Sequence, residues 1–163
     1  IDGKRQDETG KASVIGFDSN DAEARVSIDL TDAYRDRAKQ VTRDVALTNL
    51  RKAVVVRDRY ELTSHHDIVW AMTTDADIAI LPDGAAALSL DGKKLIARVI
   101  EPKGVAFVME SAERPGPEKP NKGVRRLLLR VNDATGNTNI SVMLAPVWDD
   151  GAVESIESKL LAN

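Results

Sequence analysis

Short apolar stretches separated by turn residues follow one another along most of the chain. In ARVSIDL, residues 24–30, the apolar Val26, Ile28 and Leu30 alternate with polar residues. Successive side chains of a strand point to opposite faces, so this alternation predicts a half-buried β-strand. The β-branched run at 53–56 favours a strand over a helix, because branching at Cβ restricts the side chain in a helix. Similar patterns predict strands around 41–47, 68–70, 78–80, 105–109, 127–131 and 140–144.

The clearest hairpin is predicted at SLDGKKLIARV, residues 89–99. Asp91 and Gly92 can adopt the positive φ angles of a tight turn, and apolar positions flank them on both sides. About ten strands at a spacing of roughly 8–12 residues indicate an all-β fold, an antiparallel β-sandwich. Residues 31–39 are interpreted as a short helix or an irregular loop, and 153–161 as a terminal helix. Three prolines predict a long exposed loop, since proline cannot donate to a ladder: Pro115, Pro117 and Pro120.

The composition is that of a soluble globular protein, with 42% hydrophobic and 30% charged residues among 163. This length predicts one domain over residues 1–163. The net charge of -3 argues against a broad nucleic-acid footprint, and no apolar run is long enough for a membrane-spanning helix. Because the chain has no cysteine, disulfides, thiolate zinc sites and cysteine nucleophiles are excluded.

The first residue is Ile1, and the opening IDGKRQDETGK has neither a basic nor an apolar region of a signal peptide. The sequence is therefore interpreted as a fragment of a larger multidomain protein. Such a fragment is expected to lack upstream parts of any site that the whole protein forms.

Five segments in order resemble the C-terminal half of heparinase II/III-like polysaccharide lyases. IDGKRQ is similar to the segment that follows a His-Asn-Thr motif in that family, and SIDLTDAY to a strand that ends in an acidic residue and a tyrosine. TRDVALTNLRKAVVVRDRYEL resembles an Arg-led strand pair, although Arg57 places Asp58 one residue late. HDIVWAMTT resembles the next strand, in which relatives often carry a histidine where this sequence has Met72 to Thr74. LSLDGKKLIARV is similar to a late hairpin.

The resemblance implies a helical toroid upstream and a cleft in which a uronic-acid glycan is cleaved by β-elimination. That reaction needs a group that neutralises the substrate carboxylate, a base and an acid. In the family these residues precede the position of Ile1, so no catalytic or cofactor-binding residue and no tight metal is expected in this chain. A structural divalent metal in the parent protein is compatible with the family. The implied partners are an acidic polysaccharide and the toroid, and the implied location is the periplasm or the cell exterior. The alternative is a non-catalytic carbohydrate-binding or structural module.

His65 and His66 are the only histidines. By position in the family, Asp18 and one of them could be partial metal ligands, but a zinc site needs about four ligands, so a solvated histidine pair is favoured. Tyr34 and Tyr60 could act as acid or base, although packing at a strand edge is favoured for both. Trp70 is interpreted as core. Trp148 could stack on a sugar ring, with core or interface packing favoured.

Basic residues form two groups that could contact a polyanionic glycan if the fold brings them together. The acidic residues interspersed among them favour an ordinary solvated face. The groups are Arg35, Arg37, Lys39, Arg43, Arg51, Lys52, Arg57 and Arg59, and then Lys119, Lys122, Arg125 and Arg126.

Overall fold

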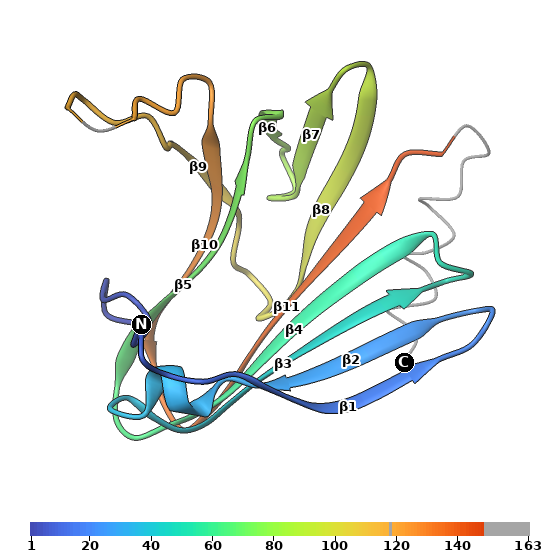
Figure 1. Cartoon of the computed structure of the whole chain (residues 1–163). Coiled ribbons are helices and arrows are strands. Elements are labelled where there is room, and N and C mark those ends of the chain that lie inside the picture. The colour runs from blue at the N-terminus through green and yellow to red at the C-terminus, as the bar shows by residue number, and fades with distance from the viewer. Residues whose placement is uncertain (118, 149–163) are drawn as a thin grey trace.

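The computed structural model of the chain describes residues 1–117 and 119–148 (Figure 1). The helix predicted at 153–161 lies outside these residues. No helix in the described part is long and apolar enough to cross a membrane. Eleven strands and one short 3-10 helix make up the described elements: β1 (Ser13–Ser19), β2 (Ala24–Asp29), η1 (Thr31–Tyr34), β3 (Ala38–Thr48), β4 (Ala53–Leu62), β5 (His66–Thr74), β6 (Asp77–Ile80), β7 (Ala86–Leu90), β8 (Lys93–Glu101), β9 (Val108–Ser111), β10 (Arg125–Ala134) and β11 (Asn137–Pro146).

These strands form two antiparallel sheets, which confirms the predicted all-β sandwich. The large sheet has eight strands in the order β1-β2-β3-β4-β11-β8-β7-β6, and the small one has three in the order β5-β10-β9. Figure 1 shows the small sheet standing over one part of the large, curved one. The last strand, β11, lies between β4 and β8, so the centre of the large sheet closes only when the end of the described chain is in place.

The core fills the space between the two sheets. The large sheet contributes side chains such as Val41, Ile140 and Val142, and the small sheet contributes Trp70 and Leu129. Strand residues alternate between faces, and the register of the sheet carries this alternation from strand to strand. The large sheet therefore has an apolar inner face toward the small sheet and an outer face that carries most of its polar side chains.

The turn predicted at Asp91 and Gly92 is confirmed, because both residues have positive φ angles, 48° and 74°. It joins β7 to β8 in the expected register, with Leu90 opposite Lys93. The segment 31–39 contains only the short helix η1 before β3 begins.

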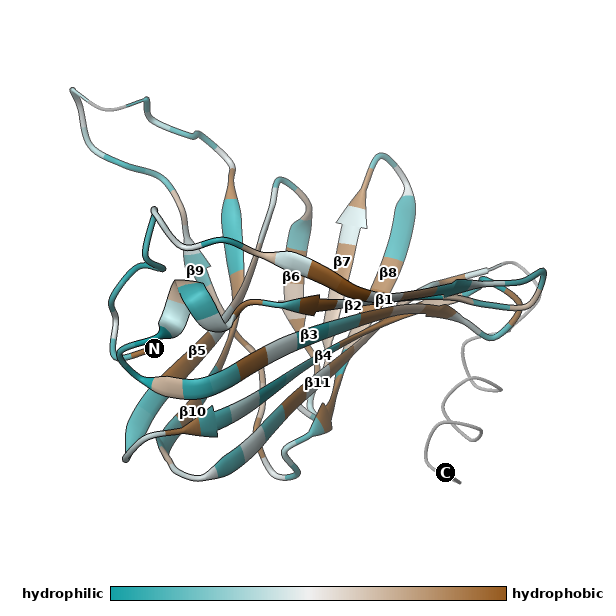
Figure 2. Cartoon of the chain, turned by 60° about the horizontal axis from the view of Figure 1, so that its bottom comes forward, coloured by the Kyte–Doolittle hydropathy of each residue, from teal (hydrophilic) through white to brown (hydrophobic). Residues whose placement is uncertain are grey.

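Two features of the strand prediction are wrong. The strand expected at 105–109 begins later, at Val108, and Phe107 precedes it as a buried loop residue. Strand β1 was not predicted at all. Its side chains are exposed along its whole length, including Val14, Ile15 and Phe17, so the strand has no buried face. The hydropathy colours in Figure 2 show hydrophobic residues next to one another in the first part of β1, without the alternation that marks a half-buried strand.

Candidate functional site

Within the described residues, both histidines and three of the aspartates lie together at one end of the sandwich. We call this the His–Asp cluster: Asp2, His65, His66, Asp67 and Asp133. The Nδ1 atom of His66 lies 2.8 Å from Oδ2 of Asp2, and Nδ1 of His65 lies 2.8 Å from Oδ1 of Asp133. Three separate segments meet here, namely the N-terminal residues, the start of β5 and the end of β10.

Backbone hydrogen bonds hold these segments in place. The amide of Asp2 donates to the carbonyl of Asp67 at 2.7 Å, and the amide of Asp67 donates to Oδ1 of Asp2 at 3.0 Å. The carboxylate of Asp67 in turn accepts the amide of Asp133 at 2.9 Å. Both oxygens of Asp2 are therefore engaged, which orients the His66 ring that they face.

The two histidines occupy different environments. The side chain of His66 is 10% exposed, whereas that of His65 is 68% exposed. The expectation of a solvated pair is therefore correct for His65 and wrong for His66. On its other ring nitrogen, Nε2 of His66 lies 3.1 Å from Oγ of Ser64. The hydrogen bond from His66 is the main reason that the pKa of Asp2 lies below its ordinary value, and the amide of Asp67 adds to the effect.

This geometry orients the imidazole of His66, which can hold or pass a proton. It does not bring the ligands together around one point, as a metal ion requires. Asp18 lies in β1 opposite Arg25, in a different sheet from His66, so the positional pairing of Asp18 with a histidine is wrong. Across residues 1–117 and 119–148, no three histidine, aspartate or glutamate side chains are arranged to hold a metal ion. A stable zinc site needs about four ligands around one point, whereas the histidines of the cluster form two separate pairs, His66 with Asp2 and His65 with Asp133.

The rings of both tyrosines pack on the core, as expected, but neither residue lies in an edge strand. Tyr34 lies in η1, not in a strand, and its hydroxyl accepts a hydrogen bond of 2.7 Å from Nε2 of Gln6. Tyr60 is buried in β4. Burial raises the pKa of Tyr60 far above its usual range, and Asp58 adds to the rise. This shift disfavours the phenolate form that a base at Tyr60 would need.

Most residues of the two basic groups are matched by acidic or polar partners. Arg35 contacts Asp7 and Asp32, and the remaining ion pairs join strands. These pairs are Lys39 with Glu61, Arg43 with Asp58, Arg59 with Asp44 and Arg125 with Asp77. Arg51 donates to Ser19 and to two backbone carbonyls, and Arg57 donates to Ser141. The fold therefore distributes these charges among partners and does not concentrate them into a cationic patch.

The two tryptophans have separate roles. Trp70 is buried and packs against Phe107, with ring centroids 6.2 Å apart, as predicted for a core residue. Trp148 is 41% exposed and lines a hollow of about 580 Å³ together with Gly92, Lys93 and Lys94. Its Nε1 donates to the carbonyl of Lys52 at 3.2 Å, and the Lys52 Nζ lies 6.0 Å from the ring centroid. The indole ring of Trp148 is thus held at the surface, and Trp148 is not a core residue.

Sequence reasoning singled out the histidines but not Asp2, Asp67 or Asp133, their carboxylate neighbours. These aspartates lie far apart along the chain, and only the pairing of β5 with β10 and the docking of the N-terminal residues bring them together. Asp67 immediately after the histidine pair was the one local signal. Asp133 could not be found without the register of β5 and β10, nor Asp2 without the docking of the N-terminal residues.

Comparison with known proteins gives a likeness in structure only. The sequence matches no protein-family model and no curated protein sequence. Among solved structures, the heparan sulfate lyase HepC from Pedobacter heparinus is similar with a TM-score of 0.66 and 13% identity, over 83% of this chain and 22% of that one. The heparinase III BT4657 gene product is similar with a TM-score of 0.67 and 13% identity, over 86% of this chain and 22% of that one.

This likeness confirms, at the level of fold, the resemblance to heparinases that the sequence suggested. An identity of 13% establishes no more than the fold. The chain spans about a fifth of the length of these structures.

Proposed function

We propose that the chain is the β-sandwich part of a polysaccharide lyase that cleaves uronic-acid-containing glycans by β-elimination. The observation that supports this most directly is the fold, which is similar over 83% of the chain to that of a heparan sulfate lyase. Residues 1–163 would then form one domain of a larger protein, and a helical toroid of the same polypeptide would form the other wall of the cleft.

The His–Asp cluster is consistent with a supporting role in such a protein. β-Elimination next to a carboxylate needs a neutralising group, a base for the C5 proton and an acid for the leaving oxygen. The described residues supply two imidazoles that face carboxylates, the exposed one of His65 and the largely buried one of His66. Arg57 and Arg59, the arginines nearest to them in the sequence, contact Ser141 and Asp44 instead. The fragment alone is therefore proposed to be inactive. A polymeric glycan substrate also implies a protein that works in the periplasm or outside the cell.

The experiment compares the parent protein with this chain alone on heparan sulfate and on other uronate polymers. Each cleavage leaves a double bond in the new terminal uronate, so absorbance of the unsaturated product reports the reaction directly. We expect activity from the parent and none from the chain. A parent that leaves every uronate polymer intact contradicts the proposed reaction, and an active chain contradicts the proposed division of the site.

A further inference from the structure

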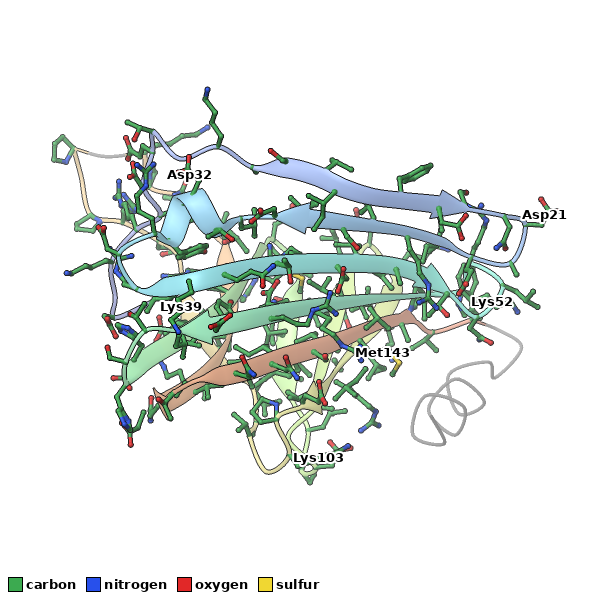
Figure 3. All side chains as sticks on the ribbon, turned by 90° about the horizontal axis from the view of Figure 1, so that it is seen from below. Asp21, Asp32, Lys39, Lys52, Lys103 and Met143 are labelled. Atoms are coloured by element: carbon green, nitrogen blue, oxygen red, sulfur yellow. The ribbon has the colours of Figure 1, made fainter. Side chains whose placement is uncertain are left out.

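A regular ladder of polar side chains crosses the outer face of the large sheet. Three strands in exact antiparallel succession, β3, β4 and β11, set its rungs through their register. The polar ladder consists of the rung Gln40, Glu61 and Asn137, the rung Thr42, Arg59 and Asn139, and the rung Asp44, Arg57 and Ser141. Neighbouring rungs are two residues apart, which is about 6.7 Å along a strand. Figure 3 looks from below onto these strands, with Lys39 and Met143 labelled.

The first two rungs line a hollow. Its volume is about 490 Å³, and six of its lining residues belong to the ladder. The side chains of Gln40, Asn137 and Asn139 are exposed here, and within the described residues their amides make no hydrogen bond. A primary amide offers both donors and an acceptor, so these three groups can bind a ligand without first losing a protein partner.

The charged members of the ladder are already held in position. The Nη2 atom of Arg59 lies 2.6 Å from Oδ2 of Asp44, one rung away. Nε of Arg57 donates to Oγ of Ser141 at 2.9 Å, and Ser141 donates to Oε2 of Glu101 at 3.2 Å. These side chains are thus engaged within the protein, so the amides of Gln40, Asn137 and Asn139 are the groups that the ladder offers to a ligand.

The chemistry of the surface selects the ligand class. Two arginines and two carboxylates balance each other within the ladder, so a strongly anionic ligand gains no net attraction. Hydroxyl groups, in contrast, match amides that both donate and accept. No aromatic side chain is a member of the ladder, and Tyr60, which lines the hollow together with Ile15, is only 8% exposed. Binding therefore depends mainly on hydrogen bonds and is expected to be weak.

We propose that the polar ladder binds the hydroxyl-rich face of a saccharide chain through Gln40, Asn137 and Asn139. This surface is opposite to the one packed on the small sheet and does not include the His–Asp cluster. The inference stands apart from the proposed lyase function, because binding is measured without any turnover.

The test is a titration of the 163-residue chain, followed by the NMR signals of the side-chain amides. A hyaluronan oligosaccharide serves as the acidic probe and a cello-oligosaccharide as the neutral one. We expect shifts of the Asn137, Asn139 and Gln40 signals with either probe at millimolar concentration, and little change at high salt. Shifts with both probes identify the hydroxyl pattern as the determinant, whereas shifts with one identify the sugar type that the ladder accepts.

The double substitution N137A/N139A should weaken binding about five- to tenfold, the effect of losing hydrogen bonds to two amides. N132A is the matched control, because Asn132 is an exposed asparagine of β10 outside the ladder. Because Asn137 and Asn139 are both exposed, their replacement should leave the fold intact. A backbone amide spectrum that matches that of the wild type verifies this. Three outcomes overturn the proposal: no amide shift with either probe, equal affinity of N137A/N139A and N132A, or loss of binding at high salt.

Discussion

Arg43 and Asp58 form a two-pronged ion pair on the inner face of the large sheet. Nε and Nη2 of Arg43 donate to the two oxygens of Asp58 at 2.6 and 2.7 Å, and the two residues lie directly opposite each other in β3 and β4. The carboxylate is 1% exposed, whereas the arginine side chain is 40% exposed. Hydrogen bonding to Asp58 raises the pKa of Arg43. The buried partner thus depends on the half-exposed one for its charge compensation.

Removing the arginine should therefore destabilise the fold. R43A leaves the Asp58 carboxylate buried without its cation, which costs about 3 kcal/mol of unfolding free energy in comparable pairs. The partial exposure of Arg43 lets water compensate in part, so a value at the lower end is expected. Urea unfolding measures the change. R25A, which breaks the exposed pair with Glu23, is the control and should cost less than about 1 kcal/mol. Equal losses in both variants would show that Asp58 is solvated in solution.

The same pair shows what the sequence could and could not predict. Arg43 and Asp58 both interrupt apolar strand patterns, and each appears unfavourable on its own. Opposite each other in the register they neutralise one another, and the strands remain half-buried as predicted. Pairing partners depend on register, which a local pattern does not contain. The alternation and turn chemistry gave most strands, whereas β1, with both faces exposed, and the aspartates of the His–Asp cluster depended on tertiary contacts.

Acid should weaken the attachment of the N-terminal residues. The pKa of Asp2 lies below its ordinary value because His66 and the amide of Asp67 favour the charged carboxylate. A carboxyl with a lowered pKa in the folded state contributes stability above its unfolded pKa, about 4, and that contribution is lost as the pH falls through the folded value. Wild type and D2N should therefore differ in urea midpoint at neutral pH and converge in acid.

The matched control for this pH dependence is D36N, since Asp36 is an exposed aspartate outside the cluster. Its urea midpoint should follow that of the wild type at every pH. A D2N difference that is constant from neutral to acidic pH would assign the effect to packing, and the inferred role of the charged carboxylate would be incorrect.

Phe107 should anchor the loop before β9 to the core. Its ring is 2% exposed and contacts Trp70, and its amide donates to the carbonyl of Gly84 at 3.1 Å. F107A removes a buried aromatic side chain and should lower the unfolding free energy by about 3–5 kcal/mol. V108A changes the neighbouring, 42% exposed side chain and should stay within about 0.5 kcal/mol. Similar effects of the two substitutions would mean that the segment does not dock as described.

Alanine substitutions at Gly84 and Gly92 should distinguish the cost of backbone strain from the cost of steric overlap. Both have positive φ angles, 82° and 74°. A Cβ at Gly92 would meet nothing within 4 Å, whereas one at Gly84 would lie 2.9 Å from Cβ of Ala106. G92A should therefore cost about 1 kcal/mol through backbone strain alone. G84A carries the same strain and in addition pushes against Ala106, so its cost should be larger by at least about 1 kcal/mol. Thermal and urea unfolding of the two variants measure the difference. If G84A proves no costlier than G92A, the loop that holds Ala106 can move aside, and the packing of Phe107 next to it would be looser than the structure shows.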